Sequence, residues 1–255
     1  MIRVVLNGWS GKMGQSVWKF AESQEDIEVV AGVAEDEVNG NTFPVFKNAD
    51  ECNVEADVII DFSRPEALEP IIKLAERKNI PLVVCTTGLE DKHFEMLNEL
   101  SKKVPVFQES NVSVDFNALL DLVQLGTKLL GDTCDIEIIE KHHNTKIDAP
   151  SGSAYMIAEA INDVLDERKE YVYDRHATKG MRSNKEIGIH AIRGGNIVCE
   201  HNIMFIGHDE RIEINHLTQS KNIFANGSFQ ATRFLIKQKP GMYHMKDVLN
   251  KKIIN

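Results

Sequence analysis

The chain has 255 residues, of which 42% are hydrophobic, so it can bury the core of one large domain or of two ordinary ones. Its net charge of −10 argues against a general binder of nucleic acid or of anionic membranes, which would need a basic face. Its four cysteines are widely spaced and no apolar run approaches the roughly 18 residues of a membrane span, so we expect a cytoplasmic protein with reduced thiols. A strand-like run follows Met1 directly, and we therefore expect no signal peptide.

The first third of the chain has the pattern of a nucleotide-binding unit. Residues 2–6 predict a buried strand and residues 15–23 a helix, with a G-x-x-G-x-x-G turn from Gly8 to Gly14 between them. Glycines in such a turn let the backbone approach a pyrophosphate, which then faces the N-terminus of the helix. Ser10 takes the middle position of the commoner G-x-G-x-x-G, so the motif by itself leaves a plain turn as the alternative.

An acidic pair follows the second predicted strand, residues 27–33. Glu35 and Asp36 lie about 20 residues beyond the glycine turn, where a carboxylate accepts hydrogen bonds from an adenosine ribose. Asp36 would repel the 2′-phosphate of NADPH, and Lys12 would offset this repulsion only in part. We therefore expect that the protein accepts NADH at least as well as NADPH.

Strand and helix patterns continue to alternate along the first half. We expect strands at 58–62, 81–85 and 104–107, and a helix at 65–78. Polar residues follow each strand, and in an open parallel sheet such strand ends form the ligand-binding edge. Two of them, Thr86 and Thr87, would serve equally well as ordinary strand-end caps. The alternation predicts an α/β fold with a Rossmann-type doubly wound parallel sheet.

The second half changes character. Helices are expected at 114–131 and 154–165, and strands at 135–140, 188–193, 197–205 and 210–216. A Gly194-Gly195-Asn196 turn is expected to join the strands on either side of it as a hairpin. This pattern predicts a second α+β domain with a mostly antiparallel sheet, whose free face would be a natural subunit interface. Residues 231–236 are predicted to be helical, and residues 245–249 to pack back onto the first domain.

A polar stretch between the strand that ends at Glu140 and the next helix holds the densest group of candidate catalytic residues. Adjacent residues of an extended segment point to opposite sides, so His142 and His143 have different roles, and an imidazole can exchange a proton near neutral pH. Lys146 adds a positive charge, and the Pro-Ser-Gly-Ser helix start offers free N–H groups. The expected ligand is a small anion with an atom that needs protonation. The alternative is a capped helix start with both histidines on a solvated loop.

Four further histidines lie on or next to the later strands: His190, His201, His208 and His216. They lack the tight spacing of zinc ligands, so we interpret them as structural and expect no metal site.

The residues from Glu140 to Ser153, E-K-H-H-N-T-K-I-D-A-P-S-G-S, closely resemble the signature E-x-H-H-x-x-K-x-D-A-P-S-G-T of the dihydrodipicolinate reductases. Other landmarks of that family are matched in the same order at Gly8 to Gly14, Asp61 to Glu66, Thr86 to Gly88, Asn111 to Ser113 and Phe224 to Gly227. The resemblance implies a dinucleotide-binding Rossmann domain, here residues 1–112 and 222–255. It also implies a substrate-binding and oligomerisation domain, here residues 113–221, and a homotetramer.

The resemblance further implies an NAD(P)H-dependent reductase that transfers hydride to the cyclic imine 4-hydroxy-tetrahydrodipicolinate, a small dicarboxylate on the diaminopimelate route to lysine. By position, His142 resembles the proton donor and Lys146 its catalytic partner. The substrate site would comprise His143, Gly152, Ser153 and Thr87. The cofactor contacts would be Gly8, Trp9, Ser10, Gly11, Lys12, Met13, Glu35, Cys85, Thr86, Thr87, Glu109, Ser110, Asn111 and Val112.

Three positions depart from the family pattern. Ser153 replaces a threonine but keeps the hydroxyl, Cys85 replaces a common glycine beside the nicotinamide, and Asp36 stands where some members have an arginine for the NADPH phosphate. Three other interpretations stay open. The chain could be another two-domain nicotinamide oxidoreductase for a different oxo or imino acid, a nucleotide-sensing module without turnover, or a metal hydrolase that uses the histidines.

Overall fold

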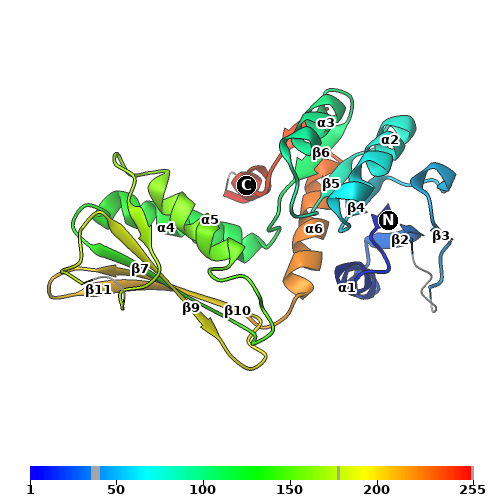
Figure 1. Ribbon diagram of the computed structural model, residues 1–255. Coiled ribbons are helices and arrows are strands. Elements are labelled where there is room, and N and C mark those ends of the chain that lie inside the picture. The colour runs from blue at the N-terminus through cyan, green and yellow to red at the C-terminus, as the bar shows by residue number, and fades with distance from the viewer. Residues whose placement is uncertain (36–40, 177–178, 254–255) are drawn as a thin grey trace. The chain divides into compact units, whose positions relative to one another are not determined.

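The computed structural model describes residues 1–35, 41–176 and 179–253, and it divides into two compact units (Figure 1). The first unit comprises Met1–Val114 and Lys221–Asn255, and the second comprises Asp115–Ser220. Each unit has a sheet and a hydrophobic core of its own. Within the described residues, no helix combines the length and the apolar character that a membrane crossing requires.

The first unit is built on a parallel sheet. In the described residues this sheet has seven strands in the order β12-β6-β5-β4-β1-β2-β3. Their bounds are β1 (Ile2–Asn7), β2 (Ile27–Val33), β3 (Val45–Phe46), β4 (Val58–Asp61), β5 (Leu82–Val84), β6 (Pro105–Gln108) and β12 (Gly241–Tyr243). The chain order reverses beside β1, so the carboxyl ends of β1 and β4 flank the point where such sheets bind ligands.

Helices cover both faces of this sheet (Figure 1). One face packs on α1 (Lys12–Ala21), α6 (Asn222–Leu235) and α7 (Met245–Ile253), and the other on α2 (Leu68–Lys78) and α3 (Asp91–Ser101). Alternate residues of one strand serve the two cores: Leu6 faces the first set of helices and Val5 the second. The predicted doubly wound α/β fold is therefore confirmed.

The C-terminal segment completes this first unit. Met245 and Val248 of α7 lie in the same core as Leu6, as the sequence predicted. The helix expected at residues 231–236 is longer, because α6 begins at Asn222. It runs through Gly227, where a Cβ would lie only 1.7 Å from the carbonyl oxygen of Val112. Glycine here allows α6 to pack closely against the backbone of Val112.

The second unit carries a mixed, mostly antiparallel sheet with helices on one face. The strand order in the described residues is β11-β10-β7-β9-β8. The bounds are β7 (Asp135–His142), β8 (Glu170–Val172), β9 (Glu186–Arg193), β10 (Cys199–Ile206) and β11 (Arg211–Thr218), with α4 (Val114–Leu130) and α5 (Gly152–Asn162). β10 runs antiparallel to β11 and β7, and β9 runs parallel to β7 and β8. Both helices share one core with β7, β9 and β10.

The predicted hairpin between the strands on either side of Gly194-Gly195-Asn196 is wrong. β7 lies between β9 and β10 and pairs with both of them. The connection crosses the end of β7, where the Gly194 amide donates to the carbonyl of His142 at 3.0 Å and the Asn144 amide donates to that of Gly195 at 3.1 Å. The glycines therefore permit a crossing over the central strand rather than a tight reversal, and β7 becomes the centre of the sheet.

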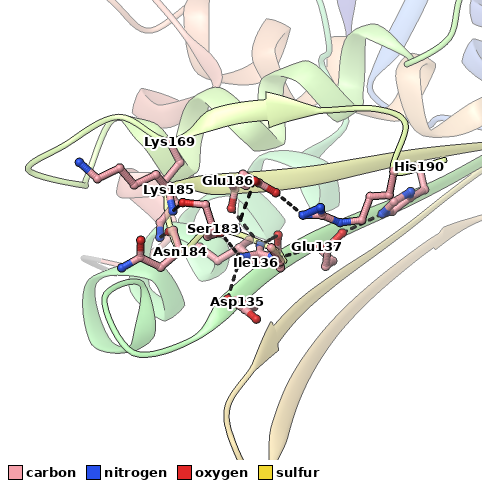
Figure 2. A network of polar contacts seen from close by, with 11 residues as sticks. Asp135, Ile136, Glu137, Lys169, Ser183, Asn184, Lys185, Glu186 and His190 are labelled. Atoms are coloured by element: carbon pink, nitrogen blue, oxygen red, sulfur yellow. Dashed lines mark hydrogen bonds and ion pairs between the residues drawn. The ribbon is translucent and has the colours of Figure 1, made fainter. Parts of the chain in front are cut away.

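Charged residues pair on the face of β7 that does not carry the helices (Figure 2). The Nε2 atom of His190 lies 2.7 Å from a carboxylate oxygen of Glu137, and Arg182 donates to the other oxygen at 3.0 Å. Gly188 lies opposite Glu137 in β9, where a Cβ would come within 1.8 Å of that carboxylate. Glu140 forms a second group of this kind with His142 and Arg193 on the other face of β7. The alternation of side chains along the strand thus places one carboxylate–histidine–arginine group on each face.

Candidate active site

The glycine turn of the first unit is shaped for a close backbone approach. Gly8 has a φ of +77°, and a Cβ there would lie 2.5 Å from the carbonyl oxygen of Phe62. A Cβ on Gly14 would lie 2.3 Å from the carbonyl oxygen of Gly8. Gly11 precedes α1 and supplies no side-chain cap, so first-turn N–H groups stay available for an anion. These features fit the pyrophosphate of a dinucleotide.

A cavity of about 620 Å³ opens beside this turn, at the carboxyl ends of β1, β2 and β4. Its lining includes Gly8, Ser10 and Gly11 from the turn and Glu35 after β2. The Glu35 carboxylate is exposed and pairs with the guanidinium of Arg64 at 2.7 Å. This carboxylate is placed to accept ribose hydroxyls, with a cation directly beside it. Asp36, the other predicted determinant of cofactor choice, lies outside the described residues.

A buried carboxylate ties the strand ends under this cavity together. Asp61 accepts hydrogen bonds from Asn7 Nδ2 and Thr86 Oγ1, both at 2.7 Å, and from the Ser63 hydroxyl. Burial raises the pKa of the Asp61 carboxyl, and these donors oppose that rise. The side chain of Thr86 is therefore engaged with Asp61, which leaves its backbone for a cofactor, while Thr87 is exposed.

The other predicted cofactor contacts differ in how deeply their side chains are buried. Trp9 and Cys85 bury their side chains in the core with α1 and α6, and burial raises the pKa of the Cys85 thiol well above its ordinary value. Their side chains are therefore not available to a ligand. Burial also raises the pKa of the Glu109 carboxyl, and Val112 is engaged by packing against Gly227. The remaining predicted contacts, Lys12, Met13, Ser110 and Asn111, are exposed or half-buried.

The second unit builds its site on the last residues of β7. The side chains of Ile136, Ile138, Glu140 and His142 alternate toward the helices and are buried. The first two fill the core, and the last two bring a carboxylate and an imidazole to its edge. The Nδ1 atom of His142 lies 2.6 Å from Glu140 Oε2. Because an ionised carboxylate only accepts, Nδ1 carries the proton and Nε2 is left for the ligand.

Arg193 and the start of α5 hold Glu140 in place. The Arg193 guanidinium donates to both carboxylate oxygens at 2.8 and 2.7 Å, and the Ser151 amide donates at 3.0 Å. Burial raises the pKa of the Glu140 carboxyl, but the donors from Arg193, His142 and Ser151 outweigh burial and hold that pKa below its ordinary value. Glu140 is therefore a fixed negative charge that orients the His142 ring.

Burial lowers the pKa of His142, and Lys146 and Arg193 lower it further, against the opposing effect of Glu140. The imidazole is therefore neutral in the unliganded protein at neutral pH. The side chain of Lys146 is 21% exposed, and its ammonium group donates to the Asp148 carboxylate at 2.7 Å. The loop between β7 and α5 is tied down by Arg193, which also donates to the carbonyl of Asp148 at 2.6 Å.

The start of α5 completes this group. Ser151 is the N-cap, and its hydroxyl accepts from the Ala154 amide at 3.2 Å. A Cβ on Gly152 would meet no atom within 4 Å, so the first turn faces open space. His143, beyond the end of β7, is half-buried and its Nδ1 lies 2.7 Å from the Thr145 hydroxyl. The first turn of α5 is therefore open, and such a helix N-terminus suits a carboxylate.

Two residues of β10 stand next to His142. The His201 ring lies 5.9 Å from the His142 ring, centroid to centroid, and Cys199 Sγ lies 3.6 Å from His201 Nδ1. Burial, with help from His216 and His142, lowers the pKa of His201 to about 3. The sequence pattern did not indicate the contacts of Glu140 and Arg193 with one another, or that Cys199 and His201 lie next to His142. The period-2 spacing of Glu140 and His142 was a readable signal, but the other three depend on which strands neighbour β7.

Comparison with known proteins matches both units to one family. "Dihydrodipicolinate reductase, N-terminus" matches residues 2–112 and "Dihydrodipicolinate reductase, C-terminus" matches residues 116–249. A 4-hydroxy-tetrahydrodipicolinate reductase of Caldanaerobacter subterraneus subsp. tengcongensis is 48% identical over 98% of this chain and 99% of its own length. One of Clostridium tetani is 43% identical over 98% of each chain. A solved dipicolinate-bound dihydrodipicolinate reductase from Paenisporosarcina sp. TG-14 superposes with a TM-score of 0.78 at 25% identity, covering 96% of this chain and 97% of that one.

Proposed function

The chain belongs to the dihydrodipicolinate reductase family and is an NAD(P)H-dependent 4-hydroxy-tetrahydrodipicolinate reductase of lysine biosynthesis, and we propose that His142 is its proton donor, with Lys146 as partner. The observation that carries this proposal is the 2.6 Å contact between His142 Nδ1 and the buried carboxylate of Glu140. It fixes the ring and its tautomer, so that Nε2 is the atom that exchanges a proton with the substrate.

The charges around His142 explain how it becomes protonated when needed. The bound cofactor supplies hydride, and reduction of a conjugated imine leaves an electron-rich enamine that needs a proton. In the unliganded protein burial and the nearby cations keep the pKa of His142 low. A substrate with two carboxylates brings negative charge to Lys146 and the α5 N-terminus, which neutralises those cations and raises the pKa. His142 then takes up a proton as the substrate binds.

We propose that four residues bind the substrate. Gly152 and Ser153 lie at the open first turn of α5, where N–H groups and the helix dipole favour a carboxylate. His143 directly follows β7 and would be the third substrate contact from the second unit. Thr87 follows β5 in the first unit and is exposed, as a substrate contact requires. The first unit, residues 1–112 with 222–255, would bind the dinucleotide, and residues 113–221 would hold the substrate.

For the cofactor we infer that NADH is accepted at least as well as NADPH. Glu35 supports this, because an exposed carboxylate at the cavity accepts ribose hydroxyls but repels a 2′-phosphate. Arg64, at 2.7 Å from Glu35, provides a cation that lets NADPH be used as well. The ratio of kcat/KM for the two cofactors tests this inference, and a clear preference for NADPH contradicts it.

We further infer a homotetramer in the cytoplasm. The sheet of the second unit exposes Ile192, Ile212 and Leu217, which suits a subunit interface. The four free cysteines fit a reducing compartment. Sedimentation of the purified chain distinguishes a tetramer from a monomer.

The decisive test is oxidation of NADH and NADPH with substrate generated in place by a dihydrodipicolinate synthase. His142→Ala and Lys146→Ala should each lower kcat by roughly 10²–10⁴-fold, the range for loss of a general acid or its partner, while the cofactor Kd changes little. Near-normal turnover in both variants would remove the assigned roles. Cofactor binding without substrate-dependent oxidation would instead point to a different oxo or imino acid, or to a sensing role.

A further inference from the structure

Three metal-ligating side chains converge beside the proposed proton donor. The ligand atoms of His142, Cys199 and His201 all lie within 4.8 Å of one another, and among the described residues no other such group is found. They come from adjacent antiparallel strands, because His201 pairs with Glu140 in the register of β10 against β7. Cys199 and His201 point to the same face two residues apart. The sheet therefore builds this group, and it does not depend on a loop.

The distances are close to those that a tetrahedral zinc ion imposes. With Zn–S near 2.3 Å and Zn–N near 2.05 Å, sulfur and nitrogen ligands stand about 3.6 Å apart. Cys199 Sγ lies 3.6 Å from His201 Nδ1. Two imidazoles on one zinc place their ring centroids about 5 Å apart by the same geometry. The rings of His142 and His201 are 5.9 Å apart, so a small rotamer adjustment closes the set.

The surroundings also have the form of a metal site. The Nδ1 atom of His142 is held by Glu140 at 2.6 Å, which leaves Nε2 as the donor atom, and such a carboxylate behind a histidine is the usual outer support of a zinc ligand. His201 is buried and neutral, the form that binds a metal. Burial raises the pKa of the Cys199 thiol to about 11, so its proton must be displaced, as commonly happens when zinc binds a thiol.

We propose that His142, Cys199 and His201 form a site for a thiophilic divalent cation, with Zn²⁺ as the type, and that the bound ion inhibits the reductase by occupying the Nε2 lone pair of His142. Coordination replaces the thiol proton, which leaves to solvent, so each bound zinc releases one proton. The proposed inhibition rests on the role proposed for His142 as proton donor, whereas the proposed metal binding does not. The inference replaces the sequence-based expectation that His201 is only structural and that the chain has no metal site.

The test titrates the full-length chain, freed of metal by a chelator, with Co²⁺ and then displaces it with Zn²⁺. Cobalt bound to a thiolate shows a near-ultraviolet charge-transfer band, and a tetrahedral site shows intense visible bands. One cobalt per chain with both features is expected. Cys199→Ser should abolish the charge-transfer band and weaken zinc binding by about 100-fold or more, since even outer-shell partners of a zinc site matter by about 10–100-fold. Cys134→Ser is the matched control, because Cys134 is a half-exposed cysteine of the same unit outside the group.

Inhibition is measured on the same proteins, with each rate compared to that protein's own rate in chelator. Zinc should inhibit the parent chain and Cys134→Ser reversibly, and Cys199→Ser should need about 100-fold more zinc. Absence of one-to-one binding, or equal zinc affinity in Cys199→Ser and the parent, overturns the site. Binding with the expected cobalt spectrum but without inhibition overturns the proposed inhibition and, with it, the role of His142 Nε2, while the site itself stands. This separates failure of the metal site from failure of the proposed function.

Discussion

Glu140→Gln is the substitution that tests the arrangement around His142 most directly. The Glu140 side chain is fully buried and accepts from His142, Arg193 and Ser151. Glutamine keeps the shape but removes the charge, which leaves Arg193, 18% exposed, without its partner. Breaking a buried pair costs about 3–5 kcal/mol, and the partial exposure of Arg193 places this case near 3 kcal/mol. The protein should stay folded, with a lower melting temperature.

The same substitution should damage turnover much more than binding. The amide can donate to Nδ1 of His142, which moves the ring proton to Nε2 and removes the charge that favours the imidazolium. Loss of a carboxylate behind a catalytic histidine lowers kcat by up to about 10⁴-fold, so we expect a fall of roughly 10²–10⁴-fold. The donor must be protonated, so kcat/KM falls as pH rises through the pKa of His142. Because Glu140 raises that pKa, the fall should begin at lower pH in the variant.

The assay is NADH oxidation from pH 5.5 to 8.5, together with cofactor affinity and thermal melting. Glu137→Gln is the matched control, since Glu137 holds His190 and Arg182 on the opposite face of the same strand (Figure 2). It should be destabilised by a similar mechanism, yet keep kcat and the pH profile. If Glu140→Gln retains at least half of kcat with an unshifted profile, Glu140 does not act through His142. An equal loss of kcat in Glu137→Gln would mean that general destabilisation explains the effect.

Three further predictions address stability and cofactor choice. Folding lowers the pKa of His201 to about 3, so the folded state favours the neutral ring. The stabilisation that this ring gives to the folded state is therefore complete above pH 6.5, the ordinary pKa, and declines below it by about 1.4 kcal/mol per pH unit. Between pH 7 and pH 5 the parent chain should lose about 2 kcal/mol of unfolding free energy that His201→Gln does not lose; equal losses in urea titrations contradict this. Ser151→Ala removes the cap on Ala154 and should cost about 1 kcal/mol in the same titrations. Arg64→Ala should lower kcat/KM for NADPH more than for NADH, because it leaves Glu35 without a cation at the cavity; an equal effect on both argues against that role.

The first unit was largely predictable because its signals are local. Each buried parallel strand is a short apolar run, and the glycine turn is required by sterics at Gly8 and Gly14. The elements not predicted there include the helix α3 and two strands whose reason lies elsewhere in the fold. β3 and β12 are two and three residues long. The first turns of α6 contain Gly227, which is explained only by the carbonyl of Val112 against it.

The wrong hairpin had a direct consequence for the predicted site. With β9 and β10 paired to each other, nothing would place Arg193 or His201 beside β7. In the structure β7 is central, and its register sets Arg193 opposite His142 on one side and His201 opposite Glu140 on the other. Turn residues tell where a chain changes direction, but the partner of a strand is decided by burial over the whole sheet. The motif on β7 could be recognised in the sequence, but the strands that pair with β7 could not.

Those neighbours also explain why one imidazole can suit two different ligands. A proton donor and a metal ligand both need a ring fixed through Nδ1 with Nε2 open, and Glu140 provides this for His142. Whether Nε2 of His142 takes a proton or a metal ion is decided by the other groups close to it. A dianionic substrate bound as proposed, at Lys146 and the α5 N-terminus, would favour a proton on Nε2, whereas the thiol of Cys199 and the neutral ring of His201 would favour a soft cation there. Zinc and the dicarboxylate should therefore compete, so the zinc concentration for half inhibition should rise with substrate concentration in the parent chain. An inhibition constant that is independent of substrate would place the metal away from Nε2 of His142.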